Sequence, residues 1–142
     1  MIEIELRCWD KITKSIRQVE AIYFDKGSIA SLELVRITVS ETIVRFPDDV
    51  ILMRFSGFDD VAGRKIHEGD LLRDLEHPNA KELAEVFFHP LGYWALRYIY
   101  PNGVVDDEIP LGEYVCDGCA SAFKVAGNIY ENPELLEGEN GN

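Results

Sequence analysis

Short stretches in which apolar and polar residues alternate constrain the fold of this chain more than any other feature. At the N-terminus Ile2, Ile4 and Leu6 alternate with charged residues, which is the two-residue period of a half-buried strand. Further candidate strands are rich in β-branched and aromatic residues, and several end in turn signals. They cover residues 19–24, 32–39, 43–46, 50–55, 71–72, 94–100 and 104–105. The sequence therefore predicts a mainly β protein.

Residues 78–88 are the one segment that the pattern predicts as a helix. Pro78 suits a first turn, and Leu83, Val86 and Phe87 recur at spacings of three and four. We therefore expect a twisted, mainly antiparallel sheet, or a partly open SH3-like small barrel, with one short helix.

Length and composition favour one domain. The chain has 142 residues, 46% of them hydrophobic, and no low-complexity linker, so we expect a single domain over residues 1–136 and a flexible acidic tail over 137–142. No apolar run approaches the ~20 residues that span a bilayer, and the glutamates near the N-terminus are unlike a secretory signal. With an odd number of cysteines, three, we expect a cytoplasmic protein.

The charge is negative and uneven. Fourteen basic residues face 26 acidic ones, which gives a net charge of −12. From Pro101 onward Lys124 is the only basic residue among nine carboxylates, a net charge of −8. Because nucleic-acid binding depends on cationic side chains, this third of the chain disfavours it. An acidic face serves most often for solubility, and a basic partner is the alternative.

Two cysteines, Cys116 and Cys119, have the spacing of half a tetrahedral zinc site or of a redox dithiol. The remaining ligands would have to come from scattered positions: Cys8, His67, His77 and His89. We therefore favour buried or loop cysteines and expect no cofactor, with a metal site and a dithiol as alternatives.

No serine, cysteine or threonine stands beside a recognisable base, so the sequence predicts no catalytic residue. Two dense groups of polar residues leave alternatives open. A metal-assisted enzyme could use Asp59, Asp60, His67, Glu68 and Asp70, and a hairpin could bind a divalent cation through Asp106, Asp107 and Glu108. We expect the latter to be solvated turn residues.

A possible binding patch combines basic side chains with the aromatic residues of 93–100. The basic residues Arg54, Arg64, Lys65 and Arg73 lie close in sequence, and Trp94 begins a row that continues with Tyr98 and Tyr100. Such a row can stack on bases. It is more often part of a hydrophobic core, which is the interpretation we favour.

Three blocks of the chain resemble the YopX-like family, small proteins of bacteriophages and prophages. These blocks are IELRCWDKITKSI (residues 4–16), ILMRFSGFDDVAGRKIHEGDLL (51–72) and VAGNIYENPELL (125–136). The resemblance implies a mainly β fold, a location in the cytoplasm of a bacterial host cell, and a role that the family leaves undefined. It implies no catalytic residue.

The third block is predicted to hold the end of the chain in place. We expect a short strand over residues 126–130 that docks on the sheet, with Ile129 and Tyr130 on opposite faces. Pro133 lacks a backbone donor and ends the pairing, and Leu135 and Leu136 then fix a last turn. A binding motif is the alternative.

These observations favour a phage or prophage accessory protein that is not an enzyme and acts by binding a macromolecule, more readily a protein than a nucleic acid. The alternatives are a small-barrel module that binds nucleic acid or a short ligand, and the metal-assisted enzyme. Because open sheets leave edge strands that a second copy can cover, we also expect a homo-oligomer.

Overall fold

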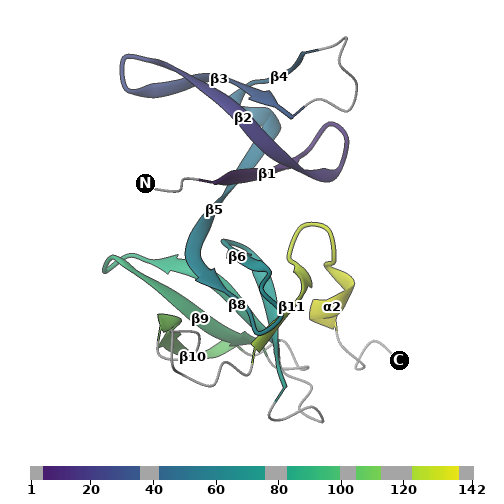
Figure 1. The fold of residues 1–142 in the computed structure, drawn as a ribbon, viewed down its shortest axis with the longest axis vertical. Coiled ribbons are helices and arrows are strands. Elements are labelled where there is room, and N and C mark those ends of the chain that lie inside the picture. The colour runs from purple at the N-terminus through teal and green to yellow at the C-terminus, as the bar shows by residue number, and fades with distance from the viewer. Residues whose placement is uncertain (1–4, 36–41, 76–82, 100–104, 113–122, 138–142) are drawn as a thin grey trace. The chain divides into compact units, whose positions relative to one another are not determined.

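The computed structural model describes residues 5–35, 42–75, 83–99, 105–112 and 123–137 (Figure 1). The chain divides into two compact units, residues 1–54 and 55–142, and each is described by itself. The first contains β1 (Leu6–Asp10), β2 (Ser15–Asp25), β3 (Ser28–Leu34), β4 (Ile43–Arg45), the 3-10 helix η1 (Pro47–Asp49) and the start of β5 (Val50–Asp59). The second contains the end of β5, β6 (Lys65–His67), β7 (Asp70–Asp74), β8 (Leu83–His89), β9 (Tyr93–Ile99), β10 (Val105–Pro110), β11 (Phe123–Asn128) and the helix α2 (Glu134–Glu137).

The predicted fold class is confirmed. All strand pairs are antiparallel, the described strands form no closed barrel, and α2 is a short helix. The prediction of a single domain over residues 1–136 stays a prediction, and most of the expected acidic tail lies outside the described residues. None of the helices in the described part of the chain is both long and apolar enough to cross a bilayer.

In the first unit the strands pair in the order β4-β3-β2-β1-β5. One face of this sheet forms a core of Cys8, Leu32, Leu34 and Val50, against which Val19 and Ile22 also pack. The β2–β3 hairpin closes through Lys26 and Gly27, whose φ angles are 51° and 84°. Positive φ at both central residues gives a turn that matches the twist of the flanking strands, and glycine adopts it without strain.

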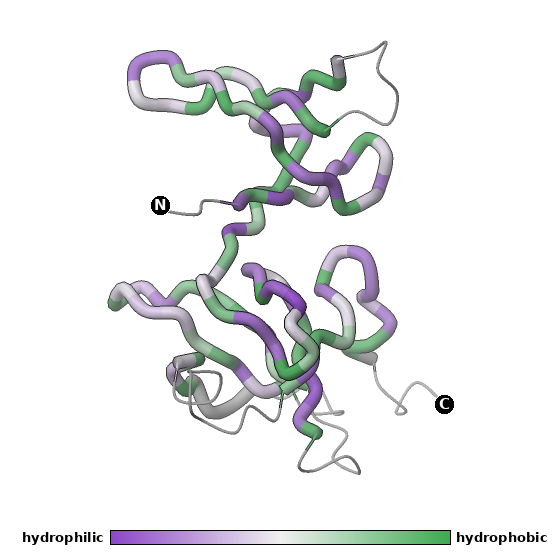
Figure 2. The backbone as a smooth tube through the Cα atoms, in the orientation of Figure 1, coloured by the Kyte–Doolittle hydropathy of each residue, from purple (hydrophilic) through white to green (hydrophobic). Residues whose placement is uncertain are grey.

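In the second unit five strands pair in the order β10-β9-β8-β7-β11, while the end of β5 pairs with β6. Hydrophobic and hydrophilic stretches follow one another along these strands (Figure 2). The core combines Ile66, Leu72, Ala84, Val86, Leu96, Leu111, Phe123 and Val125.

The helix predicted over residues 78–88 is wrong for its described part. Residues 83–89 form β8, which pairs with β7 through Leu71 opposite Glu85 and with β9 through Val86 opposite Leu96. Ala84 and Val86 lie two residues apart, on one face of β8, and both enter the core. The spacing of Leu83, Val86 and Phe87 fits a helix equally well, but β-branched and aromatic residues at 86–88 favour a strand between two partners. Residues 78–82 lie outside the described part.

The aromatic row of β9 belongs to the core, as favoured from the sequence. Trp94 and Tyr98 are half-buried and pack against the core cluster on the same face as Leu96. Tyr100 lies outside the described residues. These rings therefore stabilise the second unit, and their packed faces are not available to a ligand.

The C-terminal block does dock on the sheet, but its strand lies earlier than predicted. β11 ends at Asn128, and residues 129–131 form a turn instead of a strand. The Asn128 side chain causes this, because its Oδ1 accepts hydrogen bonds from the amides of Tyr130 (3.1 Å) and Glu131 (2.8 Å). Ile129 and Tyr130 are thus not on opposite faces of a strand, although both are half-buried.

Candidate binding surface

Asp10, at the end of β1, is a fully buried carboxylate. Its Oδ1 accepts a hydrogen bond from Arg45 Nε (2.8 Å), and its Oδ2 accepts from Arg45 Nη2 (3.0 Å) and Thr13 Oγ1 (2.7 Å). Burial alone would raise the pKa of Asp10, but the hydrogen bonds from Arg45, Thr13 and the Ile12 amide outweigh it and hold the pKa below its ordinary value. A carboxylate kept ionised by a bidentate arginine holds two strands together and is unsuited to general acid or base chemistry.

Cys8 lies in the same core as a free thiol. Burial, followed by the negative charge of Asp10, raises the pKa of this thiol to about 11. Because the thiolate is the reactive form, Cys8 is inert at neutral pH. Cys116 and Cys119 lie outside the described residues, so the predictions about them stay predictions.

Both carboxylate oxygens of Asp60 accept hydrogen bonds from backbone amides. Its Oδ1 accepts from the amides of Ala62 (2.9 Å) and Arg64 (2.8 Å), and its Oδ2 accepts from the amide of Val125 in β11 (2.9 Å). The Val61 amide donates to the carbonyl of Phe123 (3.1 Å). The turn after β5 therefore covers the outer edge of β11, which a sheet must otherwise protect in another way.

Asp70 and His67, two other residues of the metal-assisted alternative, also make contacts that stabilise the fold. The buried Asp70 accepts a hydrogen bond from the backbone amide of His67 (2.8 Å), and the His67 ring lies 5.7 Å from that of Phe55. Asp59 is exposed. Within the part of the chain that the structure describes, no group of three or more His, Cys, Asp or Glu side chains could hold a metal ion. This alternative gains no support.

The predicted basic patch is distributed over both units. Arg54 is exposed on β5 in the first unit, Arg64 is exposed in the turn after β5, and Arg73 lies opposite Lys124 in the β7–β11 pair. Lys65 Nζ lies 5.2 Å from the centre of the Phe55 ring, and Trp94 packs edge-on against Phe88 with 5.3 Å between ring centres. A surface made of all five predicted residues stays a prediction.

A row of charged and aromatic side chains, not predicted from the sequence, lies on the other face of β8 and β9. Arg97 lies opposite Glu85, and its Cζ is 4.1 Å from the centre of the Phe87 ring. His89 stacks on Tyr93 with 4.5 Å between ring centres. Burial raises the pKa of Glu85, while the charge of Arg97 opposes the shift. Because these side chains pack against one another, little of their surface is left to contact a ligand.

The first unit exposes several large hydrophobic side chains. They are Ile12 (59% exposed), Tyr23 (50%), Phe24 (65%), Val35 (44%), Val44 (43%) and Phe46 (60%). Single exposed apolar residues are normal on a protein surface, and the described part of the second unit has four of them, Val61, Leu75, Phe88 and Leu91. Tyr23 and Phe24 are adjacent near the end of the β2–β3 hairpin.

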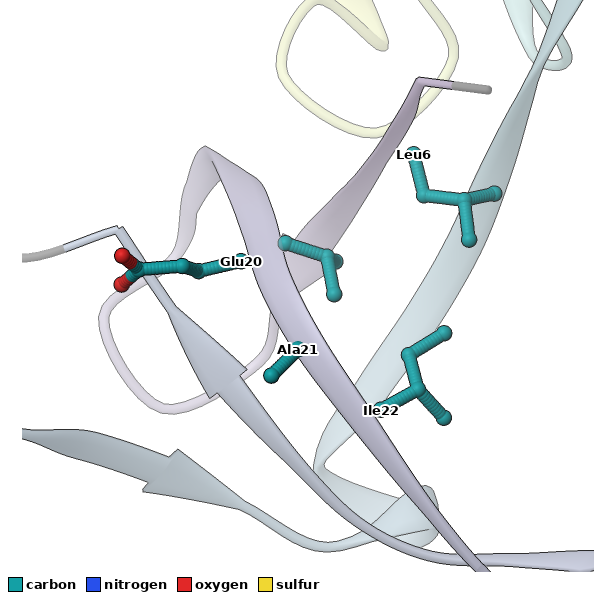
Figure 3. A pocket seen from close by; sticks show the side chains of 5 residues that line it. Leu6, Glu20, Ala21 and Ile22 are labelled. Atoms are coloured by element: carbon teal, nitrogen blue, oxygen red, sulfur yellow. The ribbon is translucent and has the colours of Figure 1, made fainter. Parts of the chain in front are cut away.

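A shallow cavity of about 170 Å³ lies at the base of the same hairpin, lined by Leu6, Val19, Glu20, Ala21 and Ile22. It coincides with an irregularity in β2, where the register shifts between Val19 and Ala21. Figure 3 shows Leu6 and Ile22 on one side of β2, with the carboxylate of Glu20 pointing away from them. Four of the five lining residues are aliphatic and the fifth is Glu20, and the size of the cavity suits one apolar side chain.

This surface was missed in the sequence because exposure depends on pairing. Residues 19–24 are an apolar run that predicts a buried strand, and nothing in it distinguishes Phe24 from its buried neighbours. The turn signal at Asp25, Lys26 and Gly27 was the available clue, since aromatic residues next to a tight turn lie at the tip of a hairpin.

Two comparisons with known proteins agree with this description. The model of one family, described as YopX protein, matches residues 5–137. The crystal structure of protein EF1440 from Enterococcus faecalis is similar, with a TM-score of 0.64 and 20% sequence identity over 96% of this chain and 100% of that chain. At this identity the likeness shows the fold alone. Among curated proteins, no sequence matches the chain.

Proposed function

Because the chain belongs to the YopX family, we propose that it is a phage- or prophage-encoded accessory protein of the bacterial cytoplasm that binds another protein and catalyses no reaction. The observation that carries this proposal is the set of large hydrophobic side chains that the first unit exposes, among which Phe24 and Phe46 are 65% and 60% exposed. Aromatic side chains of this kind supply much of the binding energy at protein interfaces.

The partners of the buried carboxylates also support a protein that binds and does not catalyse. Asp10 is paired with Arg45, and Asp60 accepts hydrogen bonds from three backbone amides. Catalytic groups need a pocket and an approach for substrate. Among the described residues, these buried carboxylates face only their structural partners.

The charge supports a protein partner over a nucleic acid. A protein with a net charge of −12 repels phosphate backbones, and it attracts basic protein surfaces at low ionic strength. A nucleic-acid-binding module remains the second candidate only for the region around Arg64 and Lys65.

Affinity capture from bacterial lysate at low and high salt tests the proposal. The wild-type chain is compared with the F24S/F46S variant and with L91S as control, because Leu91 is an exposed apolar residue of the second unit. We expect a captured protein that nuclease treatment does not release, that L91S retains and that F24S/F46S loses. Capture of nucleic acid alone, or equal capture by all variants, would contradict the proposal.

A further inference from the structure

We propose that the β2–β3 hairpin, with the cavity at its base, is the contact site of the first unit, and that it binds a cationic protein segment carrying apolar side chains. This inference rests on the proposed function and specifies the surface and the chemistry of the partner.

The hairpin presents an apolar strip that continues from the core. Cross-strand partners share a face of the sheet, and the register places Ile22 opposite Leu32 and Phe24 opposite Ile29. Ile22, Ile29 and Leu32 all belong to or pack against the core of the first unit. Phe24 is on the same face but 65% exposed. The core therefore extends outward along the hairpin into solvent, where a partner can cover it.

The cavity lies at the inner end of this strip. It is lined by Leu6, Val19 and Ile22, and Ile22 links it to Phe24 two residues further along β2. A partner segment in extended conformation repeats its side chains on one face every ~7 Å. Such a segment can place one apolar side chain in the cavity and the next against Phe24.

Carboxylates lie on the opposite face of the hairpin from this strip. Tyr23 Oη donates a hydrogen bond to Glu33 Oε1 (3.2 Å). The hydrogen bond and the charge of Glu33 raise the pKa of Tyr23, and the charge of Glu20 adds to the shift. Between residues 18 and 35, Lys26 is the one basic residue beside Glu20, Asp25 and Glu33.

This charge selects among possible partners. A sheet is a single layer, so Glu20 and Glu33 act on a segment docked on the opposite face within about one Debye length, ~10 Å at 0.1 M salt. They repel nucleic-acid phosphates and anionic lipids. A second copy of this chain, docked symmetrically, would bring the same carboxylates together. A lysine- or arginine-rich protein segment has both the charge and the apolar side chains that the hairpin fits.

Fluorescence anisotropy with a labelled peptide of about nine alternating lysine and leucine residues, long enough to span the strip, tests the inference. Two further peptides serve as probes, one with glutamate in place of lysine and one with serine in place of leucine. We expect only the lysine–leucine peptide to bind, with a Kd on the order of 10 μM, as for a small interface. Raising the salt concentration should weaken it.

Matched variants locate the site. The F24S and E20Q/E33Q variants should each bind the lysine–leucine peptide with an affinity about tenfold lower than that of the wild type. L91S and D59N/E131Q should bind as the wild type does, because they remove an exposed apolar side chain and two exposed charges from the second unit. Circular dichroism confirms that each variant is folded.

Five outcomes would overturn the inference. If F24S and the wild type bind the peptide equally well, the hairpin is not the binding site. If the glutamate peptide binds as well as the lysine–leucine peptide, the partner is not selected for positive charge. Self-association that F24S abolishes assigns the strip to a second copy. If no peptide binds while the lysate capture still yields a protein that F24S/F46S loses, the partner chemistry is wrong and the proposed function stands. If that capture also fails, the proposed function fails with it.

Discussion

Gly127 and Asn132 approach so closely that residue 127 has no room for a side chain. A Cβ at Gly127 would lie 2.5 Å from Asn132 Oδ1 and 3.0 Å from Leu135 Cδ1. The same Oδ1 accepts a hydrogen bond from the Asn128 amide (3.2 Å), and the Asn132 amide donates to the Asn128 carbonyl (3.0 Å). Glycine and the two asparagines of the GNIYEN string therefore form one structural unit that holds the end of the chain on β11.

Replacing Gly127 by alanine should destabilise the second unit. The added methyl group must displace Asn132 or Leu135, and overpacking of this kind costs about 1–3 kcal/mol in the free energy of unfolding. Urea denaturation followed by circular dichroism measures the loss. Gly112→Ala is the matched control, since its Cβ would meet only the Phe58 ring, at 3.4 Å from Cζ and 3.9 Å from Cε1, which are ordinary contacts. Equal stability of G127A and G112A would contradict the structural role of this string.

Asp60→Asn should destabilise the chain and make it prone to aggregation. An amide keeps one acceptor oxygen, so the variant loses either the bonds to Ala62 and Arg64 or the bond to Val125. Leaving a buried amide without its acceptor costs about 1–3 kcal/mol, and the outer edge of β11 becomes accessible to other strands. Denaturation and light scattering measure the two effects. With Asp59→Asn as control, no difference between the two variants would show that Asp60 does not protect the edge.

The sequence predicted the class of fold because its alternating segments and turn residues describe local geometry. The strands at 19–24, 50–55 and 94–100 lie within β2, β5 and β9 or overlap them. It misassigned residues 83–88 because the apolar spacing there fits both periods, and the choice was made by pairing with β7 and β9. Long-range pairing of this kind cannot be read from a local pattern.

The roles of the polar residues were predicted less well. Asp60 and Asp70 were grouped as candidate ligands because they are near in sequence, yet both accept hydrogen bonds from backbone amides, and that of Val125, bound by Asp60, is 65 residues away. The Asp10–Arg45 pair joins residues 35 positions apart. The structural role of residues 125–136 was predicted, because glycine, asparagine and proline constrain the backbone directly, while the position of the strand within it was not.

The ion pair of the first unit should give a distinct pH dependence. Because the folded-state pKa of Asp10 lies below its ordinary value of 3.8, the pair contributes stability at pH values above that, and this contribution is lost as the pH falls through the folded-state pKa. Asp10→Asn should therefore be less stable than the wild type at neutral pH, and the difference should shrink below about pH 4.

Arg45→Met is the complementary variant. It leaves the Asp10 charge buried and uncompensated, which costs about 3–5 kcal/mol, and acid should relieve part of that cost by neutralising Asp10. Arg54→Met, at an exposed position of β5, is the control. Urea denaturation between pH 3 and 8 checks both, and parallel pH curves for D10N and the wild type would exclude the role assigned to this pair.

Cys8 should resist thiol reagents until the first unit unfolds. Its side chain is buried and its pKa is raised to about 11, so both access and thiolate are lacking at pH 8. In a C116S/C119S variant, which leaves Cys8 as the only cysteine, we expect no reaction with a chromogenic disulfide reagent in buffer and one equivalent in denaturant. Rapid reaction in buffer would mean that the core around Leu32 and Leu34 is open.

Hydrogen–deuterium exchange tests most directly where the protein binds. The chain is measured alone and with the protein that it captures from lysate, and amide protection is compared between the two. The account predicts new protection over residues 15–34 of the β2–β3 hairpin and no change over residues 123–137. Protection confined to residues 57–72 or to the C-terminal block would contradict it.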